Sequence, residues 1–447
     1  MDKIESISSQ RTKKAKKNII VSLLLKGASM VISFVLIPMT IGYLSTYEYG
    51  VWLTLSSLLH WIDFMDIGLG NGLRNKLSES LAANNIQLSK SYVSTAFFAL
   101  AAIITVFYVF FVVLCSFVDW YSLLNVAPEK VENLKAIVLI VTGMMCLNFV
   151  LKNITYVYFA KQVALINNLV IFAGQLFSFI SIWILIQTTE GALWKVASIY
   201  SSAPVIILLL LYPYTFWVKY KELNPSLFFF QKKYLKDLLG LGISFFFLKI
   251  GGLLIFTSSN FIISKVLAPD AVTPYSICQK YYSIITMIFT IIVTPMWSAS
   301  TEAYVRDDMK WLRNAARKMF YVCLLLLLIT SIMTVFNQFA YKIWLKDAVL
   351  VPMSINIIFA IYVTIVNVST CYSHFLFGMG KLRLQIYSTV FSGILFIAIA
   401  PYLTQMWGIS GAAISLCIAN IPAMVLNPIQ FLFVTDKSSS HYKIWYK

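Results

Sequence analysis

Charged residues are scarce in this chain. They make up 12% of its 447 residues, whereas hydrophobic residue types make up 60%. About a quarter of the residues of an ordinary soluble domain are charged, and they cover its apolar core. The shortage excludes a soluble fold of this size and indicates that lipid surrounds most of the chain.

The sequence also lacks the motifs of several enzyme and metal-site classes. It holds no P-loop, no HExxH, no GxSxG and no polar stretch long enough for a catalytic domain. Each of the six cysteines lies inside an apolar segment and none forms a CxxC pair, so we interpret them as packing residues. We therefore expect a protein that is not an enzyme and has no metal and no cofactor. An ATP-driven pump is excluded unless another chain supplies the ATPase.

Long apolar runs dominate what remains. A helix needs about 20 apolar residues to cross the bilayer core. Twelve segments meet this requirement: 18–43, 51–72, 92–118, 134–158, 163–187, 191–217, 239–266, 273–298, 315–337, 351–377, 384–405 and 409–434. The basic start of the chain is too long and polar for a signal peptide, so we expect the first run to be a membrane helix.

The net charge of +17 is concentrated in alternate connections between these runs. Lysine and arginine cluster at 3–17, 74–90, 219–236, 306–318 and 437–447, and the other connections hold few, mainly Lys130, Lys135, Lys342 and Lys346. This asymmetry predicts that both termini are cytoplasmic. It also argues against a nucleic-acid partner, because the charge is arranged as it is when it sets membrane topology.

The middle of the chain suggests a duplication. An offset of 223 residues aligns Lys26 with Lys249 and Lys90 with Arg313, which favours a parallel repeat of two six-helix halves. The predicted organisation is then as follows: a cytoplasmic basic N-terminus (1–17), a six-helix bundle (18–218), a cytoplasmic linker (219–238), a second six-helix bundle (239–434) and a cytoplasmic tail (435–447).

Polar stripes run along several of the predicted membrane helices. Lys26 shares one helix face with Ser22, Ser29, Ser33 and Thr40, because these positions recur at helical spacing. Similar stripes contain Lys280 in the eighth segment and Lys152 in the fourth. Stripes of this kind avoid lipid and face one another or water. They predict an all-α integral membrane fold with about twelve helices around a hydrated central cavity.

The sign of the charge in this cavity is positive. The candidate lining cations are Lys26, Lys249, Lys280 and Lys152, and the intramembrane acids are Asp63 and Asp66. An excess of buried positive charge is unfavourable unless lysines lose protons or an anion binds. A phosphate-bearing substrate would supply that anion. Two alternatives stay open: the lysines extend to the membrane surface as anchors, and Asp63 is either an ion-coupling residue or a structural partner of a lysine.

The segment WIDFMDIGLGNGLRNKLSES resembles the D-x-G-x-G-N-G-x-R signature of bacterial polysaccharide export proteins of the Wzx flippase type. The matching positions are Asp66, Gly68, Gly70, Asn71, Gly72 and Arg74. The resemblance places the chain in the multidrug, oligosaccharidyl-lipid and polysaccharide exporter superfamily. It implies two six-helix bundles around a cationic cavity, and it adds Arg74 to the candidate phosphate contacts. The deep cations here are lysines, whereas arginines would bind pyrophosphate in a bidentate manner.

The resemblance also implies a function, a partner set and a location. The expected function is translocation of an undecaprenyl-pyrophosphate-linked oligosaccharide, an O-antigen or capsule repeat unit, by alternating access. The expected direction is from the cytoplasmic to the periplasmic leaflet of the bacterial inner membrane. A polysaccharide polymerase and glycosyltransferases would be its partners.

Two other function classes remain as alternatives. A cation-coupled exporter of organic cations on the same fold predicts acids, and not lysines, at the centre of the cavity. A non-transporting scaffold or a membrane-embedded transferase is the other. A transferase predicts a cluster of acids in a loop, for which Asp307 and Asp308 are a weak candidate.

Overall fold

The computed structural model describes residues 2–59, 69–161, 163, 165–238, 258–346, 348–381 and 383–436. Every regular element in these ranges is a helix. The chain divides into two compact units. Unit 1 contains Met1–Ser45, Leu59–Leu123 and Ala127–Phe246, and unit 2 contains Thr46–Leu58, Leu124–Val126 and Phe247–Lys447.

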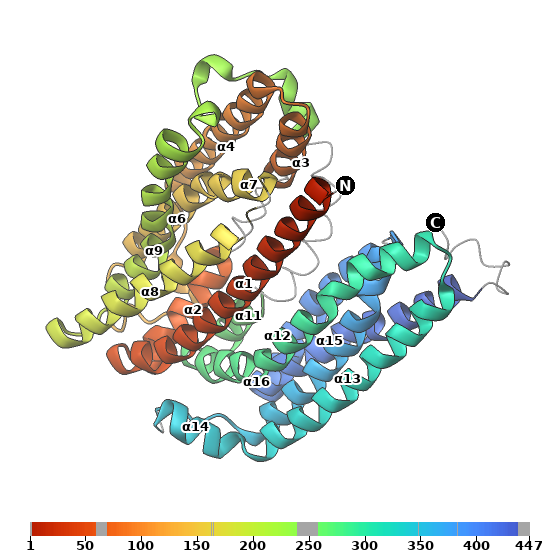
Figure 1. Cartoon of the computed structure of the whole chain (residues 1–447). Coiled ribbons are helices and arrows are strands. Elements are labelled where there is room, and N and C mark those ends of the chain that lie inside the picture. Colours follow the sequence, from red (N-terminus) through yellow and green to blue (C-terminus); the bar gives the residue numbers. More distant parts are fainter. Residues whose placement is uncertain are drawn as a thin grey trace. The chain divides into compact units, whose positions relative to one another are not determined.

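Unit 1 is built from the first and the middle parts of the chain. Its helices are α1 (Asp2–Tyr43), α3 (Leu69–Ala82), α4 (Ile86–Cys115), α6 (Leu134–Leu151), α7 (Asn153–Ala160), α8 (Leu165–Thr188) and α9 (Leu193–Pro213), with the short α5 (Trp120–Leu124) at its edge. A π-helix, η2 (Tyr214–Lys219), and two 3-10 turns, η3 (Lys221–Leu223) and η4 (Leu227–Phe229), follow. Helix α8 packs on α1 and α9, and α3 packs on α4 and α7 (Figure 1).

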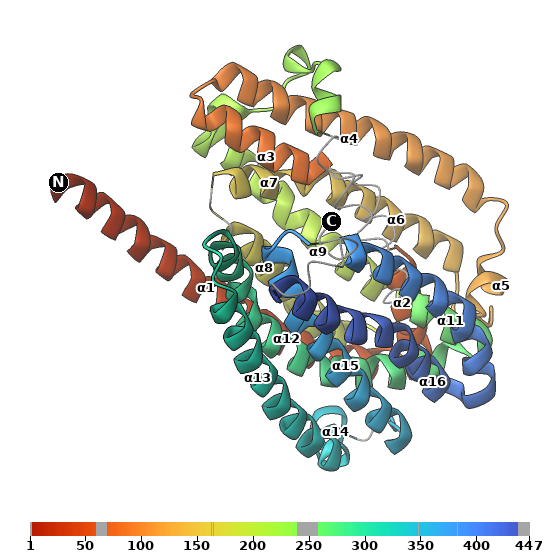
Figure 2. The same cartoon turned by 90° about the vertical axis from the view of Figure 1, so that its right-hand side faces the viewer.

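Unit 2 contains the rest of the described helices. They are α2 (Thr46–Leu59), α11 (Ser258–Val266), α12 (Pro269–Val305), α13 (Met309–Val335), α14 (Asn337–Leu345), α15 (Met353–Gly378) and α16 (Arg383–Thr435). All of α2 except its last residue belongs to this unit. Helix α15 is central, because it packs on α12, α13 and α16 (Figure 2). Helix α2 is tied to α12 by the Thr273 hydroxyl, which donates to the Thr46 carbonyl over 2.8 Å.

The helices have the length and composition that membrane spans require. Nine candidate spans lie in the described ranges. The longest, α16, is two helices, because Trp407 and Gly408 have non-helical backbone angles. Two predicted segments, 51–72 and 239–266, fall partly outside the described residues, and the other predicted segments correspond to these helices. The prediction of an all-α integral membrane fold is confirmed.

Local sequence signals explain where two of the helices begin. The Asn85 side chain accepts a hydrogen bond from the Leu88 amide at the start of α4, over 3.0 Å. Asp308 does the same for the Trp311 amide at the start of α13, over 2.9 Å. Such caps satisfy backbone amides that have no partner within the helix. The acid at 308 therefore has a structural role, and Asp307 beside it has the positive φ of a turn (59°).

Candidate functional site

Lys26 lies on α1 with its side chain exposed. The same helix has a second exposed face that is apolar, formed by Leu24, Val31 and Val35, which are 67%, 64% and 41% exposed. At about 3.6 residues per turn, Lys26 lies about 160° around the helix from the middle of this apolar face. An apolar face that stays exposed in a membrane protein contacts lipid. Lys26 therefore faces away from the lipid-contacting side of its own helix.

The rest of the α1 stripe lies on the Lys26 face and packs inside unit 1. Thr40 is fully buried, and its hydroxyl is 2.9 Å from the hydroxyl of Tyr200 on α9. Ser29 is 7% exposed. The predicted polar face of α1 therefore has two parts. Near Thr40 it contacts α9 of unit 1, and near the start of the candidate span it exposes Lys26.

Lys280 lies on α12 and is half-buried. The buried face of this helix carries Tyr275, Tyr282 and Phe289, none of which has exposed surface. Lys280 lies about 160° around the helix from the middle of that face. The lysine therefore lies on the side of α12 opposite these three aromatic residues, beside Ile277, which is 1% exposed.

One helical turn before Lys280, a hydrogen-bond chain joins three helices of unit 2. The Ser276 hydroxyl donates to Asn260 Oδ1 on α11 over 3.2 Å. Asn260 Nδ2 donates to the Ser57 hydroxyl on α2 over 2.8 Å. The stripes predicted from the sequence did not include Asn260. The signal that could have found it is the polar run that ends in this asparagine within the predicted membrane segment 239–266, because such residues often form hydrogen bonds across helices.

Lys152 marks a break in what the sequence predicted as one continuous segment, 134–158. It lies between α6 and α7, where its carbonyl accepts the Thr155 hydroxyl over 2.8 Å. The side chain is half-buried. Thr155, three residues further along, is 3% exposed. The break allows the lysine and the start of α7 to take a direction that a straight helix would not allow.

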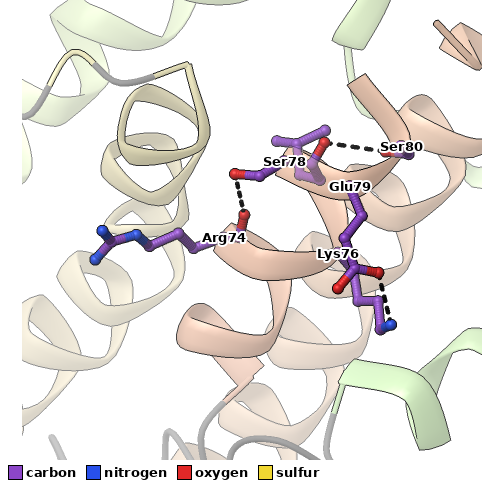
Figure 3. A network of polar contacts seen from close by, with 6 residues as sticks. Arg74, Lys76, Ser78, Glu79 and Ser80 are labelled. Carbon is purple, nitrogen blue, oxygen red and sulfur yellow. Dashed lines mark hydrogen bonds and ion pairs between the residues drawn. The ribbon is translucent and has the colours of Figure 1, made fainter. Parts of the chain in front are cut away.

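Arg74 lies on α3, four residues after Gly70 and two after Gly72 of the motif. Its guanidinium carbon is 5.3 Å from the centroid of the Phe159 ring on α7. Figure 3 shows Arg74 pointing away from Lys76 and Glu79, which form their own ion pair of 2.8 Å. The hydrogen bond to Glu79 raises the pKa of Lys76. Arg74 thus makes a cation–π contact, and within the described residues no acid forms an ion pair with it.

The motif glycines explain how α3 reaches this position. A Cβ atom on Gly70 would lie 2.0 Å from a ring carbon of Tyr156 on α7. A Cβ atom on Gly72 would lie 1.9 Å from the carbonyl oxygen of Leu238. A side chain at position 72 would meet backbone that cannot move aside, and one at position 70 would displace the Tyr156 ring. The motif glycines therefore let α3 pack closely against α7 and against Leu238. This packing places Arg74 beside Phe159.

The structure brings some of the predicted residues near one helix and leaves others apart. Arg74 and Lys152 both adjoin α7, at its opposite ends, so about 10 Å of helix separates their positions. In the described ranges no hydrogen bond or ion pair connects Lys26 to either of them. Lys249, Asp63 and Asp66 lie outside the described residues. The described residues also contain no group of three His, Cys, Asp or Glu side chains that could hold a metal ion.

Comparison with known proteins then assigns the family. Residues 15–300 match the family described as polysaccharide biosynthesis protein. The chain belongs to this family. All five candidate cations, from Lys26 to Lys280, lie within the matched region of the polysaccharide biosynthesis family. Residues 247–402 also match the MatE family.

A relative and two solved structures are also similar to this chain. A Yersinia pseudotuberculosis protein named for O-antigen export is 22% identical over 381 residues, which are 82% of this chain and 84% of the relative. An inward-facing multidrug resistance MATE family transporter of the MOP superfamily has a TM-score of 0.72 at 14% identity, covering 93% of this chain and 94% of that one. The lipid II flippase MurJ, in an inward closed conformation, has a TM-score of 0.68 at 10% identity, covering 94% and 89%. The resemblance predicted from the motif is confirmed, and the fold is that of MOP superfamily transporters.

Proposed function

We propose that this protein is a flippase for an undecaprenyl-pyrophosphate-linked oligosaccharide, an O-antigen or capsule repeat unit. It would move this lipid from the cytoplasmic to the periplasmic leaflet of the bacterial inner membrane. Membership of the polysaccharide biosynthesis family supports the substrate class. The O-antigen export name of the Yersinia relative and a fold shared with a lipid II flippase support the transport step.

The observation that carries the proposal is the placement of Lys26. It is an exposed cation in a candidate membrane span, on the face opposite to the exposed apolar residues of its helix. A lysine held away from lipid within the membrane needs water or an anion beside it. A pyrophosphate group supplies two phosphates for such lysines to bind.

The proposed phosphate contacts are Lys26, Lys280 and Lys249, with Lys152 and Arg74 as further cations. Lys280 is a half-buried cation in another candidate span, on the side of α12 opposite its buried aromatic residues. The sugars would lie in water among the polar stripes while the prenyl tail stays in lipid. Asp63 and Asp66 are the candidates for coupling transport to an ion gradient.

The alternative is a cation-coupled exporter of organic cations on the same fold. The MatE match over residues 247–402 and the structural likeness to a multidrug transporter favour it. Its cargo is positively charged and requires acids along the transport path. The polar stripes of α1 and α12 contain Lys26 and Lys280 and no acid between Ser22 and Thr40 or between Ser276 and Thr294, so we place this function second.

The test replaces the proposed phosphate contacts and follows surface glycan. Lys26→Ala, Lys280→Ala and the double variant are expressed in a strain that lacks its own flippase and synthesises the cognate repeat unit. We expect each single variant to lower display of the polysaccharide about tenfold, and the double variant to abolish it, because the anion loses its counter-charge. Polysaccharide display is measured by blotting the surface glycan.

Two controls make the result specific. Lys26→Arg keeps the charge and is expected to retain display. Lys342→Ala removes an exposed cation on α14 and is expected to change nothing. Membrane levels of each variant are measured by immunoblot. Full glycan display by the double variant, at normal protein level, would contradict the phosphate site.

A further inference from the structure

The segment that begins at the last residue of η2, residues 219–238, has a defined shape, and we call it the linker. Two hydroxyl groups of α4 hold its backbone. The Ser226 amide donates to the Ser94 hydroxyl over 3.1 Å, and the Gln231 amide donates to the Thr95 hydroxyl, also over 3.1 Å. Adjacent residues of one helix thus bind two linker amides that are five residues apart, so the chain between them forms a loop with both ends attached.

Apolar and aromatic contacts fix the linker on either side of this loop. Leu223 and Leu238 are fully buried. The Tyr234 ring is 4.9 Å from the Tyr92 ring of α4, and Lys90 Nζ is 4.5 Å from the centroid of the Phe229 ring. Figure 1 shows this green segment running over the end of α4 that adjoins α3. The linker is therefore attached along its length, and its loop is held in one place.

The loop presents apolar side chains outward. Leu227 is 72% exposed and Phe228 is 89% exposed, although their neighbours on both sides are packed against α4. A rigid loop that exposes a phenylalanine this fully to water is unfavourable, because large apolar surface favours removal from water. The tip needs an apolar partner.

Positive charge lies close to this apolar tip in the sequence. The linker contains five lysines and two acids, and the lysines are Lys219, Lys221, Lys232, Lys233 and Lys236. All five are exposed. One of the acids, Glu222, already lies 3.8 Å from Lys161 of the preceding part of unit 1. The linker thus combines an exposed aromatic residue with a net positive charge. This combination is complementary to a membrane surface, where negatively charged headgroups cover an apolar layer.

The position of the linker along the membrane axis matches such a surface. The candidate span Leu193–Lys219 ends at the first residue of the linker, and the span of α4 begins at Ile86. Just before the linker, Trp217 and Val218 are 62% and 64% exposed. Tryptophan is enriched where membrane helices leave the hydrocarbon core. The linker therefore begins at the level of the headgroups.

We propose that the linker is a membrane-surface anchor that binds anionic phospholipid. Leu227 and Phe228 insert below the headgroups, and the linker lysines bind the headgroup phosphates. The lipid is an ordinary anionic phospholipid of the bilayer, so the interaction is separate from cargo transport and does not depend on which polysaccharide is carried.

The experiment places a photo-crosslinker at the tip. The full-length protein with p-benzoyl-phenylalanine in place of Phe228 is reconstituted in nanodiscs of phosphatidylcholine alone or with phosphatidylglycerol. After irradiation, lipid adducts on the peptide around residue 228 are identified by mass spectrometry. We expect phosphatidylglycerol adducts, at a yield at least about threefold above that in discs of phosphatidylcholine alone. The same crosslinker at Val106, an apolar residue of α4 that is 70% exposed, is the positive control for lipid contact.

Charge variants separate an anionic-lipid site from simple proximity. Lys232→Gln, Lys233→Gln and Lys236→Gln are combined in the crosslinking chain, and we expect the adduct yield with phosphatidylglycerol to fall to the level with phosphatidylcholine. Lys310→Gln, Arg313→Gln and Arg317→Gln on α13 are the matched control and are expected to leave the yield unchanged. Equal yields in both lipids, or no lipid adduct at 228 while Val106 reacts, would overturn the proposal. Because no transport is measured, these outcomes are independent of the flippase test.

Discussion

Two glycines beside Arg74 let α3 approach its neighbours more closely than any other residue type would allow. Gly70 meets the ring of Tyr156, and Gly72 meets the backbone oxygen of Leu238. The contact at Gly72 is the more restrictive, since a backbone atom cannot rotate away as the end of a side chain can. The two residues therefore control the distance of Arg74 from Phe159, although neither has a side chain that touches a ligand.

Gly72→Ala is expected to destabilise the protein by about 1–3 kcal/mol, because the new methyl group forces α3 away from the linker end. The melting temperature of the detergent-solubilised protein measures this loss. Gly27→Ala on α1 is the control, because a Cβ atom there meets nothing within 4 Å. Alanine also favours helix over glycine, so this control should melt at the same temperature as the unchanged protein or above it. Equal melting temperatures for the two variants would contradict the close approach.

Several membrane helices are interrupted, and the interruptions differ in kind. Lys152 separates α6 from α7, η2 continues α9 as a π-helix, and Trp407 with Gly408 divides α16. The sequence predicted only the last of these, as a gap between the segments 384–405 and 409–434. In the structure this gap is a kink at Trp407 and Gly408. A break inside a membrane helix is tolerated where other groups form hydrogen bonds with the backbone amides and carbonyls that it frees. Those groups come from neighbouring parts of the fold, so the hydrophobic periodicity of one segment cannot predict the break.

Gly408 has φ 60° and ψ −144°, a conformation open almost only to glycine. We expect Gly408→Ala to destabilise unit 2 by about 1–3 kcal/mol, because alanine at this kink is strained. Thermal unfolding of the purified protein tests this. Gly42→Ala on α1, where a Cβ atom meets nothing within 4 Å, is the matched control. Unchanged stability of the Gly408 variant would mean that the kink is not required.

On the scale of the whole molecule, the division into units does not follow the order of the chain. Residues 46–58 belong to unit 2, although they lie between two stretches of unit 1. The sequence predicted the first bundle as the continuous range 18–218. Hydrophobic length determines which segments cross the membrane, but it contains no information about which other segments each helix packs against.

The predicted topology, with both termini cytoplasmic, is tested across a single helix. Lys310 lies at the start of α13, whose 27 residues span about 40 Å, and Lys342 lies on α14 beyond its other end; both are exposed. In spheroplasts, we expect a membrane-impermeant maleimide to label a chain with Lys342→Cys and to leave a chain with Lys310→Cys unlabelled until the membrane is opened. The native cysteines are buried or half-buried, and labelling of the unchanged chain gives the background. The reverse pattern would contradict the topology.

The sequence alone determined the membrane class, most helix positions and the polar faces of α1 and α12. These properties are local, since bilayer thickness sets helix length and the helical period sets which residues share a face. Only the tertiary structure decided that Asn260 joins Ser57 to Ser276, that Gly72 meets Leu238 and that the linker binds α4 through Ser94 and Thr95. Such contacts join residues far apart in the chain, and their partners are chosen by shape and hydrogen bonding after the helices have formed.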